Sequence, residues 1–90
     1  MRKPISPGQY FYETYIEEHG LLKPDIARHI GITEKALANF IGGTVPLNAE
    51  LAYRLAKATG KPARDWLNMQ TNYELWKNRH LENLKIDSIV

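Results

Sequence analysis

The fold of this chain is decided by residues 23–43, which read KPDIARHIGITEKALANFIGG. Apolar residues recur at helical spacing over 24–30 and again over 34–41, and Gly31 separates the two stretches. Gly31 can adopt the positive φ that a tight turn between helices requires, and Ala27 is small enough to let the helices approach closely. The pattern predicts a helix-turn-helix.

The apolar side chains of this unit fall where two crossing helices must meet, at Ile26, Ile30, Ile32, Leu37 and Phe40. A plain αα-corner inside a helical bundle satisfies parts of the same pattern, and it is the structural alternative to a DNA-reading unit. The helices predicted on either side favour the DNA-reading unit.

One helix is predicted before this unit and two are predicted after it. Ser6 and Asn48 are suitable N-caps, whereas Gly20 and Gly60 are placed to end helices. No run of β-branched residues alternates with polar ones, so no strand is expected. The prediction is an all-α, five-helix domain like that of phage (lambda) repressors, with helices over about 7–19, 24–30, 34–41, 49–59 and from 62 to about 80.

The length and composition are those of one globular domain. The chain has 90 residues, 43% of them hydrophobic, which suffices for one packed core. We expect a single domain over 1–90, with its core over about 5–80 and an unassigned tail over 81–90. The absence of Cys excludes disulfides, Cys-ligated zinc and a thiol nucleophile. Neither a signal peptide nor an apolar run of about 18 residues is found, so a soluble, cytoplasmic protein is expected.

Positive charge is concentrated in the middle of the chain. The net charge is only +2, but residues 21–61 carry six cations against three anions. A basic region around a helix-turn-helix is typical of a phosphate-contacting surface, and an ordinary solvated surface is the other interpretation. The six cations are Lys23, Arg28, Lys35, Arg54, Lys57 and Lys61.

In a helix-turn-helix the second helix enters the major groove, and its N-terminal residues face the base edges. Asn39 can bond an adenine edge with two hydrogen bonds, and Lys35 can reach guanine acceptors or a phosphate. Glu34 either accepts from cytosine or stabilises the helix N-terminus, and Thr33 either caps the helix or contacts DNA. The candidate DNA-binding residues are Lys23, Arg28, Thr33, Glu34, Lys35, Ala36, Ala38 and Asn39.

Three phrases of the sequence resemble the HigA/VapI family of antitoxins, within the Cro/CI-like (XRE) helix-turn-helix proteins. They are SPGQ at residues 6–9, AELAYRLAKATG at 49–60 and, most specifically, WLNMQ at 66–70, and the resemblance covers about residues 5–76. It implies a dimeric, DNA-binding antitoxin of a type II toxin–antitoxin system. Such a protein neutralises a small basic RelE-like ribonuclease toxin of the HigB type and represses its own operon at a palindromic operator in double-stranded DNA.

The chain departs from the family pattern at two places. Family members commonly open the second helix with a polar pair such as Ser-Gln, where this chain has Lys23-Pro24. They also often carry a basic pair after the third helix, where this chain has Gly43-Thr44-Val45. Two missing cations at a phosphate-facing loop predict weaker salt-dependent binding, for which Lys23, Arg28 and Lys35 remain to compensate.

Two protein-contact surfaces are also predicted. Trp66, Met69, Tyr73 and Trp76 recur at helical spacing and, with the apolar tail, are expected to form a homodimer seam. The same aromatics could instead pack in the core or line a ligand box. The first helix combines tyrosines with an acidic face that suits a cationic toxin, although these acids can equally be a solvated face. The candidate toxin-binding residues are Tyr10, Tyr12, Glu13, Glu17 and Glu18.

Nothing in the sequence predicts catalysis. His19, His29 and His80 lack metal-ligand spacing, and Ser6 and Ser88 lie in no nucleophile motif. We therefore expect no enzyme, no metal and no cofactor. Two other functions fit the same sequence: a stand-alone XRE-family repressor, and a helix-turn-helix protein-interaction module with weak DNA binding.

Overall fold

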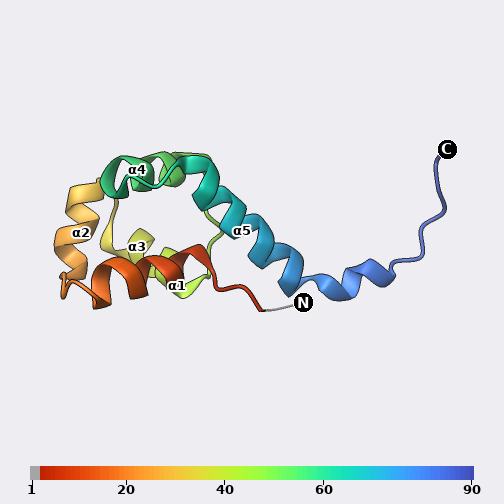
Figure 1. Cartoon of the computed structure of the whole chain (residues 1–90), viewed down its shortest axis with the longest axis horizontal. Helices are drawn as coiled ribbons and strands as arrows, with labels where there is room; N and C mark the ends of the chain where they lie inside the picture. Colours follow the sequence, from red (N-terminus) through yellow and green to blue (C-terminus); the bar gives the residue numbers. More distant parts are fainter. Residues whose placement is uncertain (1–2) are drawn as a thin grey trace.

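The computed structural model of the chain describes residues 3–90, in which every regular element is helical (Figure 1). This confirms the all-α prediction. The first four helices and the start of the fifth form a body, from which the rest of the fifth helix and the tail project, so the molecule measures 51 × 23 × 23 Å. The elements are α1 (Pro7–Phe11), η1 (Tyr12–Glu17), α2 (Lys23–Ile30), α3 (Glu34–Gly42), α4 (Ala49–Thr59), α5 (Ala63–Lys77) and η2 (Arg79–Asn83).

The predicted helix ends in the middle of the chain are confirmed within one residue. The side-chain oxygens of Ser6, Thr33 and Asn48 each accept a hydrogen bond from the backbone N–H three residues later, at 3.1, 3.0 and 2.8 Å. Such caps satisfy N–H groups that the helix itself leaves unpaired, and each stabilises the fold by about 1 kcal/mol. Thr33 is therefore an N-cap of α3, which is the first of the two roles that the sequence suggested for it.

The first helix differs from the prediction of a single α-helix over 7–19. Regular α-helix ends at Phe11, and the chain continues in the wider π-helical turns of η1. Beyond them the N–H of Leu21 donates to the carbonyl of Ile16, five residues back, at 3.1 Å. The wider turn brings Phe11, Tyr15 and Ile16 to the core side together, because a spacing of five residues lies about 140° around a 3.6-residue turn but close to one full π-helical turn.

Trp66 of α5 is the centre of the core. It is fully buried, and its ring lies 5.7 Å from Tyr10, 6.1 Å from Phe11 and 6.3 Å from Tyr15, measured between ring centroids. These contacts seat the start of α5 against α1. Trp66 therefore contributes no surface to a dimer seam, and its assignment to that seam is wrong because the body of the same chain buries it fully.

Helices α1 and α3 touch through their backbones at Gly8. A Cβ atom placed on Gly8 would lie 1.8 Å from the carbonyl oxygen of Phe40, far inside van der Waals contact. Gly8 is buried within α1, so the glycine that follows Pro7 serves helix packing. The approach fixes where α3 sits on the body.

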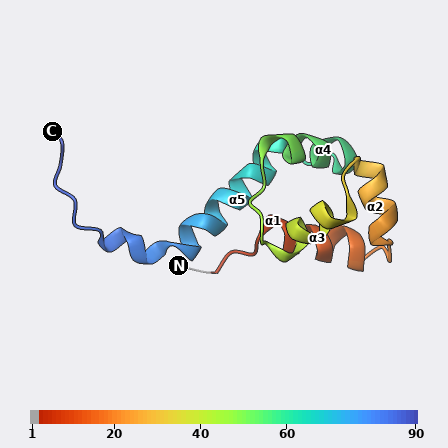
Figure 2. The same ribbon diagram turned by 180° about the vertical axis from the view of Figure 1, so that it is seen from behind.

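The end of the chain leaves the body. Helix α5 ends at Lys77 rather than near residue 80, and a short 3-10 turn, η2, is followed by the extended residues 84–90 (Figures 1 and 2). Every side chain over 77–90 is exposed. Across the described part of the chain, no helix has the length and hydrophobicity needed to cross a bilayer.

Candidate nucleic-acid interface

The predicted helix-turn-helix is formed by α2 and α3. Gly31 ends α2 with φ 87°, and the carbonyl of Ala27 accepts hydrogen bonds from the N–H groups of Gly31 and Ile32, both at 2.9 Å. A left-handed residue costs about 1–2 kcal/mol when it carries a Cβ, which explains the glycine. Ala27 is 2% exposed and lies under the turn. The helix-turn-helix prediction is confirmed.

Arg54 of α4 holds this turn from outside. Its Nη1 donates to the carbonyl oxygen of Ile30 at 3.0 Å, and its Nη2 lies 3.6 Å from the carboxylate of Glu50. A guanidinium at this point satisfies a carbonyl at the C-terminus of α2 and complements the negative end of the helix dipole. The sequence suggested only a surface cation, because nothing local links residues 24 positions apart.

Helix α3 exposes its N-terminal side chains. Leu37 and Phe40 are buried at 1% and 4% exposure, while Asn39 is half-buried at the edge of the free surface. Figure 2, seen from behind, shows α3 on the near side of the body. The predicted contacts Thr33, Glu34, Lys35, Ala36 and Ala38 are all exposed together along this helix.

A hollow of about 210 Å³ runs beside α3, along the loop that follows it and the start of α4. Asn39 lies on its wall, and the Oγ1 of Thr44 donates to the Asn39 backbone carbonyl and side-chain oxygen at 3.3 and 3.4 Å. Thr44 has one hydroxyl proton to share between these two oxygens, so each contact is weak, and neither involves the Asn39 NH₂ group.

The loop after α3 is anchored to α5 by Gln70. The Gln70 Oε1 accepts from the backbone N–H of Leu47 at 3.0 Å, and its Nε2 donates to Glu74 at 2.7 Å. Together with the buried Trp66, this explains the WLNMQ phrase physically. One of its residues fills the core, and another holds the loop beside the candidate interface.

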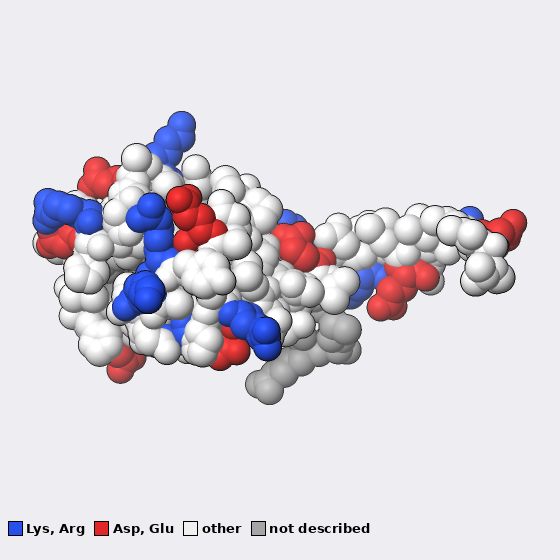
Figure 3. Space-filling view, turned by 90° about the horizontal axis from the view of Figure 1, so that it is seen from above, with Lys and Arg blue, Asp and Glu red and all other residues white. Residues whose placement is uncertain are grey.

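The cations at this interface differ in how they are held. Lys35 is exposed on the first turn of α3. Arg28 forms an ion pair with Asp25, but both side chains are more than half exposed, so the pair is weak and can exchange with another anion. The Nζ of Lys23 lies 5.5 Å from the ring centroid of Tyr12. Figure 3, viewed from the side of α4, shows Lys and Arg groups interspersed with Asp and Glu on that face.

The predicted toxin-binding residues are only partly brought together. Glu13, Glu17 and Glu18 are exposed on and just after η1 and line one shallow hollow. Tyr10 and Tyr12 are half-buried against the core, so each ring keeps only part of its surface for a partner, and their role in toxin binding stays a prediction. Their rings are covered further by lysine Nζ atoms, at 5.2 Å for Tyr10 and 5.5 Å for Tyr12.

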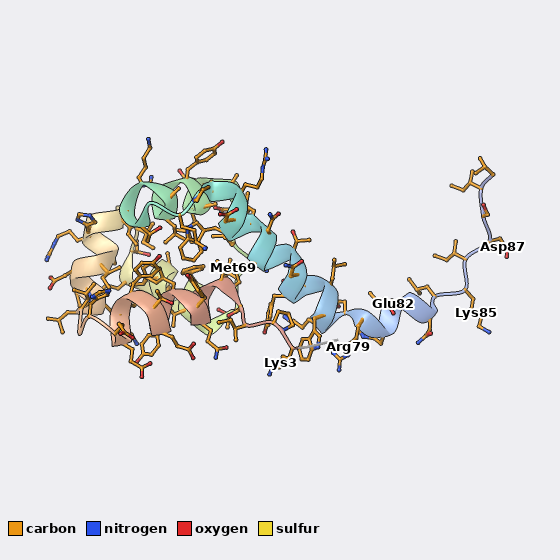
Figure 4. The ribbon with its side chains drawn as sticks, viewed as in Figure 1. Lys3, Met69, Arg79, Glu82, Lys85 and Asp87 are labelled. Carbon is orange, nitrogen blue, oxygen red and sulfur yellow. The ribbon has the colours of Figure 1, made fainter. Side chains whose placement is uncertain are left out.

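The remaining residues of the predicted seam lie along α5. Met69, Tyr73 and Trp76 are half-buried. The Trp76 ring lies 5.3 Å from the Nζ of Lys3 and 4.4 Å from the Cζ of Arg79. Figure 4 shows Lys3 and Arg79 together at the end of α5, with Met69 nearer the body. The outer half of α5 thus presents an aromatic surface edged by cations.

No protein-family model matches the sequence, but individual relatives do. The antitoxin HigA-1 of Vibrio cholerae is 34% identical over 86 residues, which cover 93% of this chain and 81% of the relative. An uncharacterised helix-turn-helix transcriptional regulator of Haemophilus influenzae is 30% identical over 79 residues, covering 88% of this chain and 74% of the relative. These relatives are antitoxins and regulators, not enzymes.

Solved structures show the same fold. An addiction module antidote protein of the HigA family from Coxiella burnetii superposes with a TM-score of 0.80 at 26% identity, covering 97% of this chain and 100% of that one. The Pseudomonas aeruginosa antitoxin HigA, solved with the higBA promoter, has a TM-score of 0.81 at 20% identity and covers 97% and 99%. The Vibrio cholerae relative matches almost the whole chain, and the chain therefore belongs to the HigA family of helix-turn-helix antitoxins.

Proposed function

We propose that this protein binds a palindromic operator as a homodimer, represses its own operon and neutralises a small basic ribonuclease toxin. The observation that carries the DNA-binding part is the exposed N-terminal surface of α3, positioned by the Gly31 turn, Arg54 and the loop that Gln70 anchors. The P. aeruginosa HigA that shares this fold was solved with the higBA promoter, which supports DNA binding by a chain of this fold.

In this proposal the first turns of α3 enter the major groove. Asn39 would read an adenine edge with its side-chain amide, and Lys35 would contact guanine or a phosphate. Glu34 keeps its two roles, as a cytosine acceptor or as an acid that stabilises the start of α3. Arg28 can leave Asp25 for a phosphate, because an exposed ion pair costs little to break.

Replacing Asn39 by Ala is expected to weaken operator binding roughly 5- to 150-fold, the equivalent of about 1–3 kcal/mol, and to relax specificity at one base pair. Lys35→Ala should reduce affinity and, if Lys35 contacts phosphate, lower the salt slope by about one. Gel-shift titration on the protein's own promoter at several salt concentrations measures both. Arg64→Ala removes an exposed cation at the start of α5, away from α3 and the tail, and is the matched control. Unchanged affinity in both α3 variants, with helicity intact, would rule out this interface.

A two-fold operator requires two recognition helices about one turn of DNA apart, and therefore a symmetric dimer. Met69, Tyr73 and Trp76 offer an aromatic surface for that dimer, and Leu75 beside them is 65% exposed. A monomer in sedimentation at tens of micromolar, with and without DNA, would contradict this part of the proposal. It would leave the helix-turn-helix as a protein-interaction module with weak DNA binding.

The toxin would bind at η1, where Glu13, Glu17 and Glu18 form an acidic cluster that suits a cationic RNA-binding protein. Changing all three to Lys is expected to abolish co-purification with the tagged product of the adjacent reading frame and to restore its toxicity. Glu82→Lys, which changes an exposed acid of η2 outside the docking tail, is the control for a surface acid-to-lysine change. If the triple variant still neutralises the toxin, the contact lies elsewhere. If the native chain does not co-purify, the alternative of a stand-alone repressor is favoured.

A further inference from the structure

A larger apolar hollow, of about 390 Å³, opens between α1, η1, α2 and the end of α4. Its apolar wall includes Phe11, Leu21, Leu22, Ile26 and Ile30. Leu21 and Leu22, in the loop before α2, are 47% and 66% exposed. No side chain of α3 lines the hollow, so an occupant would leave the recognition helix free.

The tail offers an apolar segment with nothing to pack against. Leu84, Ile86, Ile89 and Val90 are all at least 61% exposed. Residues 84–90 are not helical, and an extended segment of this length spans about 23 Å at 3.3 Å per residue. Leu84 and Ile86 are two residues apart, so they share one side of an extended strand. Lys85 between them faces the other way.

The tail and the hollow lie at opposite ends of the same molecule. Helix α2, which forms one wall of the hollow, is at one end of the long axis, and residues 84–90 are at the other (Figures 1 and 2). The molecule is 51 Å long and α5 lies between the two features, so the tail cannot reach its own hollow. Two copies lying antiparallel, side by side, would bring each tail to the hollow of the other.

We propose that residues 84–90 of one copy dock in the α1–α2 hollow of a second copy, and that the exchange is reciprocal. The proposal rests on the homodimer of the proposed function and deepens it by assigning the tail a specific receptor. Reciprocal exchange is an isologous contact, which closes a two-fold dimer instead of extending a filament. Burial of the aliphatic side chains of Leu84 and Ile86 drives the docking.

The chain has no Cys, so engineered thiols report the contact directly. Leu22→Cys and Ile86→Cys change side chains that are 66% and 78% exposed, and both variants are expected to fold. Co-expressed with different tags and treated with a short bismaleimide, they should yield a mixed cross-linked dimer. Tyr53→Cys, on α4 and also 66% exposed but outside the hollow, should not link to Ile86→Cys.

A second measurement does not depend on thiols. Ile86→Asp with Ile89→Asp should weaken dimerisation at least tenfold in sedimentation, and Leu22→Asp should do the same from the receptor side. If Ile86→Cys cross-links only to Ile86→Cys of the other copy, the two tails pair with each other. If Ile86→Cys cross-links to Tyr53→Cys as efficiently as to Leu22→Cys, the tail is not docked in the hollow. Either result overturns the exchange while leaving the homodimer standing. A monomeric native chain overturns both.

Discussion

Replacing Gly8 by Ala is expected to remove a large part of the stability of the domain. The new Cβ would lie 1.8 Å from the carbonyl oxygen of Phe40, 2.6 Å from its carbonyl carbon and 2.9 Å from the Cα of Ile41. All three atoms are backbone, so no side chain can rotate away and α1 must move off α3. We expect a cost of about 4 kcal/mol or more, because the strain falls on two packed helices. A small domain has a total stability of only about 5–15 kcal/mol.

Gly42→Ala is the matched control for this substitution. A Cβ at Gly42, in the last turn of α3, meets no atom within 4 Å. Alanine is favoured over glycine in a helix by about 0.5–1 kcal/mol, so this variant should be as stable as the native chain or slightly more so. Urea unfolding followed by circular dichroism compares the two. A native-like midpoint for Gly8→Ala would show that α1 does not lie on α3 as described.

Trp66→Ala is expected to destabilise the domain by about 3–5 kcal/mol. The side chain is fully buried, and its removal leaves the rings of Tyr10, Phe11 and Tyr15 around a cavity. Its Nε1 has no hydrogen-bond acceptor among the described residues, so Trp66→Phe removes an unpaired donor while keeping a ring. Trp66→Phe should therefore cost clearly less than Trp66→Ala.

Comparing Trp76→Ala with Trp66→Ala distinguishes a surface role for Trp76 from a core role for Trp66. Trp76 is half-buried near the outer end of α5, and its loss should cost no more than about 1.5 kcal/mol. Urea unfolding of these variants is best followed by far-ultraviolet circular dichroism. Tryptophan fluorescence is unsuitable, because the substitutions themselves remove a tryptophan. If Trp66→Ala kept native stability but lost the dimer, Trp66 would be an interface residue after all.

Local features of the fold were predictable from the sequence. An N-cap hydrogen bond joins residues only three positions apart, and a glycine with positive φ ends the helix that directly precedes it. Both signals are therefore visible in a short stretch of sequence. Thr33 and Gly31 therefore located the turn and the start of α3 without knowledge of the rest. The exposed side of α3 followed from helical periodicity in the same way, since Leu37 and Phe40 must face inward.

Features that depend on distant contacts were not predictable. Helical spacing placed Trp66 and Trp76 on one stripe, but the packing of the other helices against the start of α5 buries the first of them. The wide turns of η1 arise because the core accepts Tyr15 and Ile16 together. Arg54 at the turn is 24 residues away from its partner, and no local pattern marks such a contact.

The hydrogen bond from Leu47 to Gln70 makes the recognition helix part of a mechanical linkage. Its acceptor is on α5, the helix to which we assign the dimer seam, and its donor is in the loop that follows α3. A movement of α5 would displace that loop through this hydrogen bond. Contact of the loop with DNA would in turn restrict the movement of α5. By thermodynamic reciprocity, whatever factor subunit association adds to operator affinity in the proposed dimer, operator binding adds to association. In that proposed repressor, the Gln70 amide would couple the assembly state of the protein to its affinity for the operator.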